Sequence, residues 1–388
     1  MGKIIEFLRR KSMKKMLLIA LCFFSVTSLV FAGGSSEEQV EAEGLSIAIV
    51  TTPSGVDDGS FNEENYNGIL SFIEKNPGAS VKPLREPSGD VAKALKVASD
   101  VVADYDVEVC TGFQFAGISQ LAIDNPSTKF ILVDTFPSDP ENPAGSIVLD
   151  NVYAMMFAEQ ESGFFAGIAA ALETETKKVA VINGVAYPSN VNYQYGFECG
   201  VKYANENYST AVECVELPSQ AGTDVTGANV GGNYVGSFAD EATGKIVANQ
   251  LINKDCDILF VAAGGSGNGV FTAAKESNGS VKVIGCDVDQ WDDGVVGDDN
   301  IILTSVLKVM GLNVDRTLEK INNGTFVGKN EVLRADTDST GFVKEEGRQQ
   351  LSADTITKLD EAYELVKNGT IVPASNFGGF TPEEFQVN

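Results

Sequence analysis

Apolar runs alternate with amphipathic stretches along most of the chain. Residues 45–50 are largely apolar, as is typical of a strand in a parallel sheet that is buried on both faces. Between such runs, apolar residues recur at helical spacing, as Val91, Leu95, Ala98 and Val102 do. Because strands and helices alternate in this way, the sequence predicts an α/β fold.

The predicted elements form two successive series of similar length. The first series has strands at 45–50, 79–84, 107–111 and 129–134, with helices at 61–75, 90–105 and 115–125. The second has helices at 158–172, 193–207 and 240–253, strands at 178–183 and 211–217, a strand–helix–strand unit at 257–287 and a strand at 301–307. Two such series predict two lobes joined by several crossings. Ligands favour interfaces of this kind, so we expect a cleft between the lobes that closes by a hinge.

The composition argues against several classes of function. Among 388 residues, 54 are acidic and 28 are basic, which gives a formal net charge of −26. Nucleic acid is therefore not an expected partner, because phosphate binding needs clustered Lys and Arg. The chain has no histidine, which removes the most common general base, the usual zinc ligand and every His-based triad. The composition favours a binding protein over an enzyme, with no cofactor and no metal.

The N-terminus has the pattern of an export signal. Basic residues precede an apolar stretch at 16–31, and small residues follow it. This order predicts a signal peptide at 1–32 and a flexible tether at 33–45. A lipid anchor at Cys22 is the alternative, although cleavage there would leave the apolar segment 23–31 at the mature end. We expect an exported protein, in the periplasm or at the outer face of the cytoplasmic membrane.

Polar residues stand at the ends of several predicted strands, which is where ligands bind in such sheets. Asp134 and Asp287 each end an apolar run, and Asp287 follows the glycine-rich turn 264–269 by about twenty residues, a spacing that suits a ribose diol. Gly264 and its neighbours allow backbone N–H groups to approach a ligand closely. Lys308 could donate to a ligand hydroxyl or pair with either aspartate. For the two acids, a structural role in a loop or cap is the alternative.

Two phenylalanines are candidate stacking surfaces. Phe61 follows a turn-rich loop in the first series, and Phe238 lies at a predicted strand end in the second. Each ring could belong to the core, or the pair could sandwich a flat ligand ring when the cleft closes. Asp57 and Asp58 precede a predicted helix, and we interpret them as caps because acids there accept backbone N–H groups.

A set of short stretches between residues 46 and 330 resembles the basic-membrane-protein family of solute-binding proteins, whose best-known members are purine nucleoside receptors of ABC importers. The stretches are VDDGSFN at 56–62, TGF at 111–113, ESGFFAG at 161–167, GFECGVK at 196–202, VGSF at 235–238, AAGGSG at 262–267, VIGCD at 283–287, DQ at 289–290, LTSVLK at 303–308 and NGTF at 323–326. They occur in the family's order, and together they are specific.

The resemblance implies the fold of type I periplasmic binding proteins, with two Rossmann-like lobes and three crossings between them. It leads us to place 46–150 and 309–328 in the N-terminal lobe. The C-terminal lobe then comprises 151–308 and 329–388.

The resemblance also implies roles for the candidate site residues. Phe61 and Phe238 would sandwich a nucleobase. Gly264, Asp287 and Lys308 would hold the ribose hydroxyls, and Asp134 would contact the ligand from the first lobe. The lysine would also ease the repulsion between the two carboxylates.

Two departures from the family bear on the base. Thr52 stands where the family commonly has an acid, and Asn192-Tyr193 replaces a usual basic–aromatic pair. The expected function is capture of a nucleoside, most readily a purine nucleoside, by a monomer that delivers it to an ABC permease. A ribose-like sugar is the alternative ligand. A nucleoside hydrolase is a further alternative, for which Asp57 and Asp58 would be a sparse calcium cluster.

Overall fold

The computed structural model describes residues 44–142, 145–376 and 378–386. The predicted signal peptide at 1–32 and nearly all of the tether at 33–45 lie outside these residues. In the part of the chain that the structure describes, no helix has the length and apolar character needed to cross a membrane.

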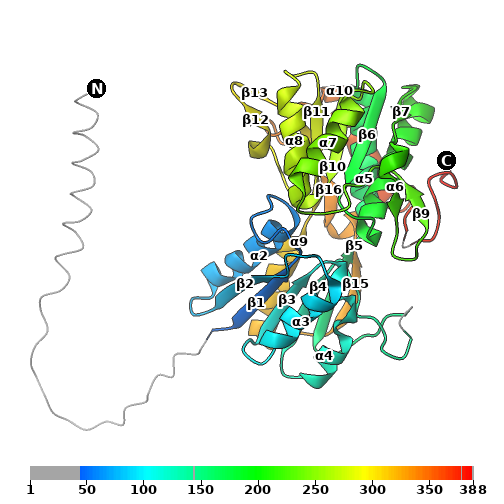
Figure 1. Ribbon diagram of the computed structural model, residues 1–388. Coiled ribbons are helices and arrows are strands. Elements are labelled where there is room, and N and C mark those ends of the chain that lie inside the picture. The colour runs from blue at the N-terminus through cyan, green and yellow to red at the C-terminus, as the bar shows by residue number, and fades with distance from the viewer. Residues whose placement is uncertain (1–43, 143–144, 377, 387–388) are drawn as a thin grey trace, which may run out of the picture. The chain divides into compact units, whose positions relative to one another are not determined.

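The first lobe is built on a six-stranded parallel sheet in the order β15-β5-β4-β3-β1-β2 (Figure 1). Its strands are β1 (Ser46–Thr51), β2 (Ser80–Arg85), β3 (Val107–Thr111), β4 (Lys129–Val133), β5 (Val152–Phe157) and β15 (Lys329–Leu333). One face packs against α2 (Phe61–Lys75) and α9 (Met310–Asn322). The other packs against α3 (Val91–Val101) and α4 (Ser119–Asp124). Because both faces are covered, the central strands are largely apolar, as the sequence predicted.

The second lobe repeats this plan with a six-stranded sheet in the order β16-β14-β11-β10-β6-β7. Its strands are β6 (Lys178–Asn183), β7 (Glu213–Cys214), β10 (Ile258–Ala262), β11 (Lys282–Gly285), β14 (Ile302–Lys308) and β16 (Thr340–Phe342). The helices α5 (Glu159–Glu173), α6 (Pro188–Tyr208) and α10 (Ala353–Lys367) cover one face, and α7 (Glu241–Ile252) and α8 (Gly267–Glu276) cover the other. Within this sheet, all pairings are parallel except that between β14 and β16.

The chain crosses between the lobes at three places. It passes from β5 into α5, from β14 into α9, and from β15 towards β16. The predicted fold class, two Rossmann-like lobes with three crossings, is confirmed.

The predicted lobe boundaries need correction. β5 pairs with β4, and β15 pairs with β5, so 152–157 and 329–333 belong to the first sheet although we had placed them in the second lobe. The apolar run 152–157 leads directly into the helix that follows, and no turn residue marks the crossing. The segment before Phe238, predicted as a strand, forms only an isolated bridge between Asn183 and Tyr234.

Glycines allow α5 and α6 to pack backbone against backbone. A Cβ atom at Gly167 would lie 2.2 Å from the carbonyl oxygen of Phe197, and one at Gly196 would lie 2.2 Å from that of Gln160. Any side chain at these positions would therefore push the two helices apart. This close approach holds the first turn of α5 against α6, next to the strand ends of the second lobe.

Candidate ligand-binding site

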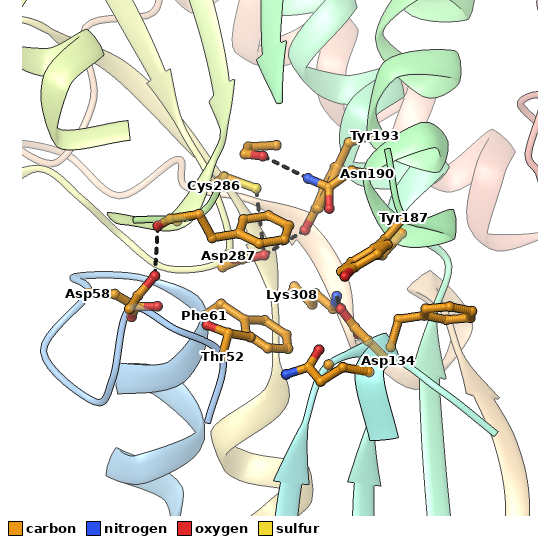
Figure 2. A pocket seen from close by; sticks show the side chains of 18 residues that line it. Thr52, Asp58, Phe61, Asp134, Tyr187, Asn190, Tyr193, Cys286, Asp287 and Lys308 are labelled. Carbon is orange, nitrogen blue, oxygen red and sulfur yellow. Dashed lines mark hydrogen bonds and ion pairs between the residues drawn. The ribbon is translucent and has the colours of Figure 1, made fainter. Parts of the chain in front are cut away.

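A cavity lies between the lobes, where the carboxyl ends of their strands face each other (Figure 2). About 530 Å³ of space lies between its walls, and this figure includes open solvent. All six predicted site residues line it: Phe61, Asp134, Phe238, Gly264, Asp287 and Lys308. The structure therefore brings together residues from four strand ends, the first turn of a helix and a connecting loop.

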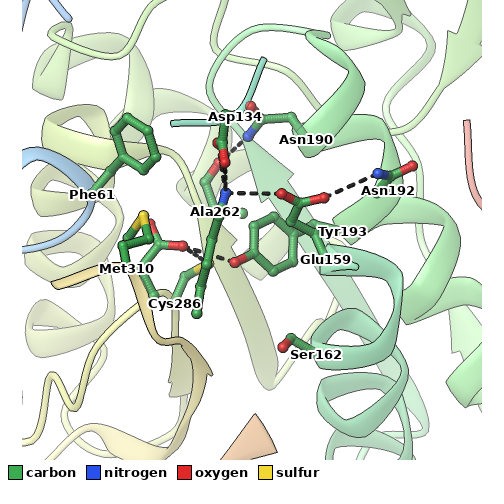
Figure 3. A network of polar contacts seen from close by, with 12 residues as sticks. Phe61, Asp134, Glu159, Ser162, Asn190, Asn192, Tyr193, Ala262, Cys286 and Met310 are labelled. Carbon is green, nitrogen blue, oxygen red and sulfur yellow. Dashed lines mark hydrogen bonds and ion pairs between the residues drawn. The ribbon is translucent and has the colours of Figure 1, made fainter. Parts of the chain in front are cut away.

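Lys308, the last residue of β14, is buried at one end of the cavity with 1% exposure. Its ammonium group lies 2.5 Å from Asp134 Oδ2 and 2.9 Å from Glu159 Oε1. Figure 3 shows the carboxylates of Asp134 and Glu159 close together, each from a different element. Of the alternatives left open by the sequence, pairing of Lys308 with Asp134 is the one that the structure contains.

Burial and charge act in opposite directions on this group of residues. Burial by itself lowers the pKa of the Lys308 ammonium, but Asp134, Glu159 and Asp287 together raise it above its ordinary value. Burial also raises the pKa of Asp134, and Lys308 opposes that rise. Lys308 is therefore charged at neutral pH. An ammonium group has three donors, so at least one remains after Asp134 and Glu159 are satisfied.

Asp287 follows β11 and is held by a hydroxyl from each lobe. Its Oδ2 accepts a hydrogen bond from Ser60 Oγ at 2.9 Å, and its Oδ1 accepts one from Tyr193 Oη at 2.8 Å. Cys286 Sγ also donates to Oδ1, at 3.6 Å, so the unoccupied acceptor site is on Oδ2, and a stronger donor could replace the thiol on Oδ1. Asp134 and Asp287 both have left-handed backbones, with φ of 67° and 72°, a conformation that aspartate adopts more readily than most residues.

We call Asp134, Asp287 and Lys308, with Glu159 behind them, the charged end of the cavity. Their exposed fractions are 9%, 9%, 1% and 1%. Among the described residues that line the cavity, Lys308 is the one cation. A fixed set of buried donors and acceptors of this kind suits a ligand with adjacent hydroxyl groups.

Aromatic rings form the walls. Phe61 begins α2, and the Lys308 ammonium lies 5.2 Å from its ring centroid. Phe238 comes from the second lobe and fits only because residue 184 is glycine, where a Cβ atom would lie 2.3 Å from the ring. Tyr187 connects Phe238 to Phe113 of the first lobe, with ring centroids 6.0 Å and 5.4 Å apart. The predicted pair of rings, one from each lobe, is thus present.

We call Thr52, Gln114 and Tyr187 the neutral end of the cavity. Thr52 Oγ1 accepts a hydrogen bond from Asn62 Nδ2 at 2.6 Å, which leaves its hydroxyl hydrogen available as a donor. Gln114 Nε2 donates to the carbonyl oxygen of Thr111 at 2.9 Å, which leaves its side-chain oxygen available as an acceptor. Neither residue carries a charge, so this end can contact polar ring atoms without demanding one pattern.

Asp58 lines the cavity but serves the helix that follows it. Its carboxylate accepts hydrogen bonds from the backbone N–H groups of Ser60, Asn62 and Glu63. The interpretation of Asp58 as a helix cap is therefore confirmed. Among the described residues, no group of three or more Cys, Asp or Glu side chains is arranged to hold a metal ion.

Comparison with known proteins identifies the family. The sequence model of the family described as "ABC transporter substrate-binding protein PnrA-like" matches residues 46–229 and 221–376, which is most of the chain. The chain belongs to this family. The PnrA-like family is a family of substrate-binding transport proteins, in agreement with the resemblance noted from the short stretches above.

Individual relatives agree with this assignment. The chain is 27% identical over 380 residues to the CD4+ T-cell-stimulating antigen of Listeria innocua, covering 92% of this chain and 98% of that protein. It is 29% identical over 343 residues to the ABC transporter nucleoside-binding protein BmpA of Lactococcus lactis, covering 81% and 87%. The solved structure of an ABC transporter solute-binding protein from Aeropyrum pernix superimposes with a TM-score of 0.70 at 22% identity, covering 85% and 93%, and supports the fold.

Several residues of this PnrA-like site were not found from the sequence. Glu159 lies in the first turn of a helix, where an acid is explained by its favourable interaction with the helix dipole. Tyr187 and Ser54 lie in loops and Gln114 lies in a short 3₁₀ helix, and none of the three has a distinctive spacing. Tyr193 was noted only as a departure from the family, and its bond to Asp287 depends on how α6 packs. These residues reach the site through tertiary packing, which leaves no pattern in the sequence.

Proposed function

We propose that this protein is the solute-binding component of an ABC importer and that it captures a purine nucleoside in the cavity between its lobes. The observation that carries the proposal is the presence of two complementary features at one site. Phe61 and Phe238 face the cavity from different lobes, and Asp287 and Lys308 offer buried hydrogen-bonding groups at its charged end. A nucleoside likewise has a flat ring at one end and a diol at the other.

The charged end matches a ribose. Asp287 Oδ2 retains one acceptor site after binding Ser60, and Oδ1 is bonded by Tyr193 and by the weakly donating thiol of Cys286. Asp287 can therefore accept from two neighbouring hydroxyls when one of them replaces the thiol. Lys308 retains a donor for a hydroxyl oxygen. Hydrogen bonds to charged groups contribute about 1.5–3 kcal/mol each, so a diol held by both residues contributes much of the affinity.

The same charges disfavour a phosphate. Three carboxylates, those of Asp134, Glu159 and Asp287, surround one ammonium group, and none of the four side chains is more than 9% exposed. A ligand phosphate would meet a net negative environment with little solvent to screen it. We therefore favour a nucleoside over a nucleotide.

The relative from Lactococcus lactis, whose name states that it binds nucleosides, supports this choice of ligand. We propose that the protein acts outside the cytoplasmic membrane as a monomer, anchored by lipid or released after cleavage, and performs no catalysis. Ligand that contacts both lobes favours the closed form, and the permease would recognise that form.

Calorimetric titration of the purified protein with adenosine, guanosine and inosine tests the proposal. Bound ligand is first removed by unfolding and refolding, and mass spectrometry of the released material identifies what the protein carries. We expect binding in the micromolar range or tighter, with a matching rise in melting temperature. No heat and no thermal shift with any nucleoside would refute the proposal.

A ribose-like sugar is the second candidate, because the charged end by itself would also suit a free sugar. Competition separates the two ligands. If ribose displaces adenosine at a comparable concentration, the rings contribute little and the sugar is the ligand. If ribose is weaker by two orders of magnitude or more, the base is part of what the site recognises. Incubation with inosine and assay of free base tests the hydrolase alternative directly.

A further inference from the structure

A second cavity adjoins the first at its neutral end. It encloses about 970 Å³, part of it open to solvent, between the ends of β1 and β2 and the loops after β6 and before α7. Four residues line both cavities: Thr52, Gln114, Tyr187 and Phe238. The remaining lining residues are Thr51, Pro53, Glu86, Pro87, Ser88, Gly89, Ala94, Val185, Gly236, Ser237 and Ala239.

The shared residues fix the direction in which the second cavity continues the first. Asp287 and Lys308 line the first cavity and are absent from the lining of the second. A nucleoside with its ribose at the charged end and its base between Phe61 and Phe238 directs the far edge of the base away from the charged end. That edge then faces Thr52, Gln114 and Tyr187, which are the boundary with the second cavity.

Two features of Thr52 and Gln114 keep this boundary open. Both side chains are short or held back: Thr52 binds Asn62 at 2.6 Å, and Gln114 Nε2 binds the carbonyl oxygen of Thr111 at 2.9 Å. Neither places a charge at the boundary. A substituent on the base therefore meets neutral groups as it passes from one cavity to the other.

The second cavity has its own chemical character. Glu86 is its one charged residue among the described lining residues, and it is 8% exposed. Its carboxylate accepts hydrogen bonds from Ser88 Oγ at 2.6 Å, Ser88 N at 2.9 Å and Asp90 N at 3.1 Å. These bonds, that from the Ser88 hydroxyl first, lower the pKa of Glu86, so it is ionised at neutral pH. The other lining groups are hydroxyls, one amide and apolar carbons.

We propose that the second cavity is a subsite for a substituent on the far edge of the nucleobase, and that the ligands include nucleosides whose base carries an uncharged or cationic aliphatic group. The inference rests on the proposed nucleoside function. Lys93 helps to lower the pKa of Glu86, but it lies outside the lining of the cavity and donates to Ser88 Oγ at 3.4 Å, not to the carboxylate. A carboxylate in this wall repels an anionic group and attracts an amine. The subsite therefore selects by charge, while the charged end of the first cavity selects for the ribose.

Four ligands of similar shape test the subsite on the wild-type protein by calorimetry. They are adenosine and its N6-propyl, N6-(2-aminoethyl) and N6-carboxymethyl derivatives. We expect the propyl and aminoethyl compounds to bind within about 3-fold of adenosine or tighter. We expect the carboxymethyl compound to bind at least 10-fold more weakly than the propyl compound, because its charge opposes that of Glu86.

Two variants sharpen the test. Pro87 lines the second cavity and not the first, so Pro87→Trp fills the subsite from an exposed loop. We expect it to weaken the binding of the propyl and aminoethyl compounds at least 10-fold and to change the affinity for adenosine by less than 2-fold. Pro87→Ala is the matched control. Glu86→Gln should reduce the preference for the aminoethyl over the carboxymethyl compound at least 5-fold.

The outcomes distinguish this inference from the proposed function. Adenosine that binds while both the propyl and aminoethyl compounds bind more than 10-fold more weakly would overturn the subsite and leave the proposed function intact. Equal weakening of all four ligands by Pro87→Trp, but not by Pro87→Ala, would also overturn it. Absence of adenosine binding to a folded protein would instead refute the proposed function on which the inference rests.

Discussion

The charged end and the neutral end of the cavity are built in different ways. Asp134, Glu159, Asp287 and Lys308 are at most 9% exposed and contact one another or fixed hydroxyls at 2.5–2.9 Å. Thr52 and Gln114 at the neutral end carry no charge, and each keeps one hydrogen-bonding function free. A rigid charged set discriminates strongly between ligands, whereas a few neutral groups discriminate weakly. The protein should therefore recognise the sugar strictly and the base loosely.

The two ends also differ in their distance along the chain from the crossings between the lobes. Glu159 begins the helix after the first crossing, and Lys308 ends the strand before the second. Glu161, two residues after Glu159, accepts hydrogen bonds from Ala335 N at 2.8 Å and Thr340 Oγ1 at 2.7 Å, beside the third crossing. The charged end thus lies beside the crossings that connect the lobes. At the neutral end, Thr52 follows β1, Gln114 lies in a short 3₁₀ helix (Phe113–Ile118) and Tyr187 precedes α6, and none of the three is at a crossing.

The largest effect is expected from Lys308→Met. It leaves the carboxylates of Asp134 and Glu159 buried without their shared cation, and breaking a buried pair in this way costs about 3–5 kcal/mol. Urea unfolding should show this loss of stability, and calorimetry should show no nucleoside binding. Glu159→Gln/Lys308→Met is the matched control, because it removes one of the stranded charges and should recover part of the stability. Wild-type stability in the single variant would mean that the charged end is not a coupled unit.

Asp287→Ala should abolish most of the affinity while the protein stays folded. It removes two acceptors for the diol, each contributing about 1.5–3 kcal/mol, so the dissociation constant should rise at least 100-fold. Asp287→Asn keeps the shape and one acceptor and should bind with intermediate affinity. Unchanged binding by Asp287→Ala, with circular dichroism like that of the wild type, would show that the ribose lies elsewhere.

Phe238→Ala should weaken binding by an intermediate amount. Stacking on an aromatic ring contributes about 1–3 kcal/mol per base, which corresponds to 5- to 150-fold in affinity. Because every base has a flat face, adenosine, guanosine and inosine should lose affinity to similar extents in calorimetric titrations. Phe238→Tyr keeps the ring and serves as the control. A loss confined to one base would show that Phe238 reads a base edge.

Gln114→Leu at the neutral end should have the smallest effect. It removes one neutral acceptor while keeping most of the side-chain volume, and a neutral hydrogen bond contributes about 0.5–1.5 kcal/mol. Affinity should fall by less than about 10-fold, and the order of preference among adenosine, guanosine and inosine should change. A loss as large as that of Asp287→Ala would remove the difference between the two ends.

The sequence predicted the fold class and four of the six candidate site residues from strand ends. In a parallel α/β sheet, residues at carboxyl ends of strands must meet at one edge, so Asp134, Gly264, Asp287 and Lys308 could be placed before any contact was known. Phe61 begins a helix and Phe238 lies in a loop, so their selection rested on the family resemblance. The role of all six residues as ligand contacts stays a prediction.

The rest of the site depends on contacts that no local pattern records. Glu159 reaches Lys308 because glycines let α5 pack closely on α6, and Tyr193 reaches Asp287 from the same helix pair. The lobe boundary was wrong because no turn residue separates β5 from the helix after it. Tertiary packing decides both features.

One set of titrations tests the central claim most directly. Adenosine, 2′,3′-dideoxyadenosine, guanosine and inosine are compared by calorimetry on the same ligand-free protein. We predict that loss of the diol weakens binding at least 100-fold, whereas exchange of the base changes affinity by less than about 10-fold. If exchange of the base costs more than loss of the diol, the charged end does not dominate recognition, and the assignment of the two ends is wrong.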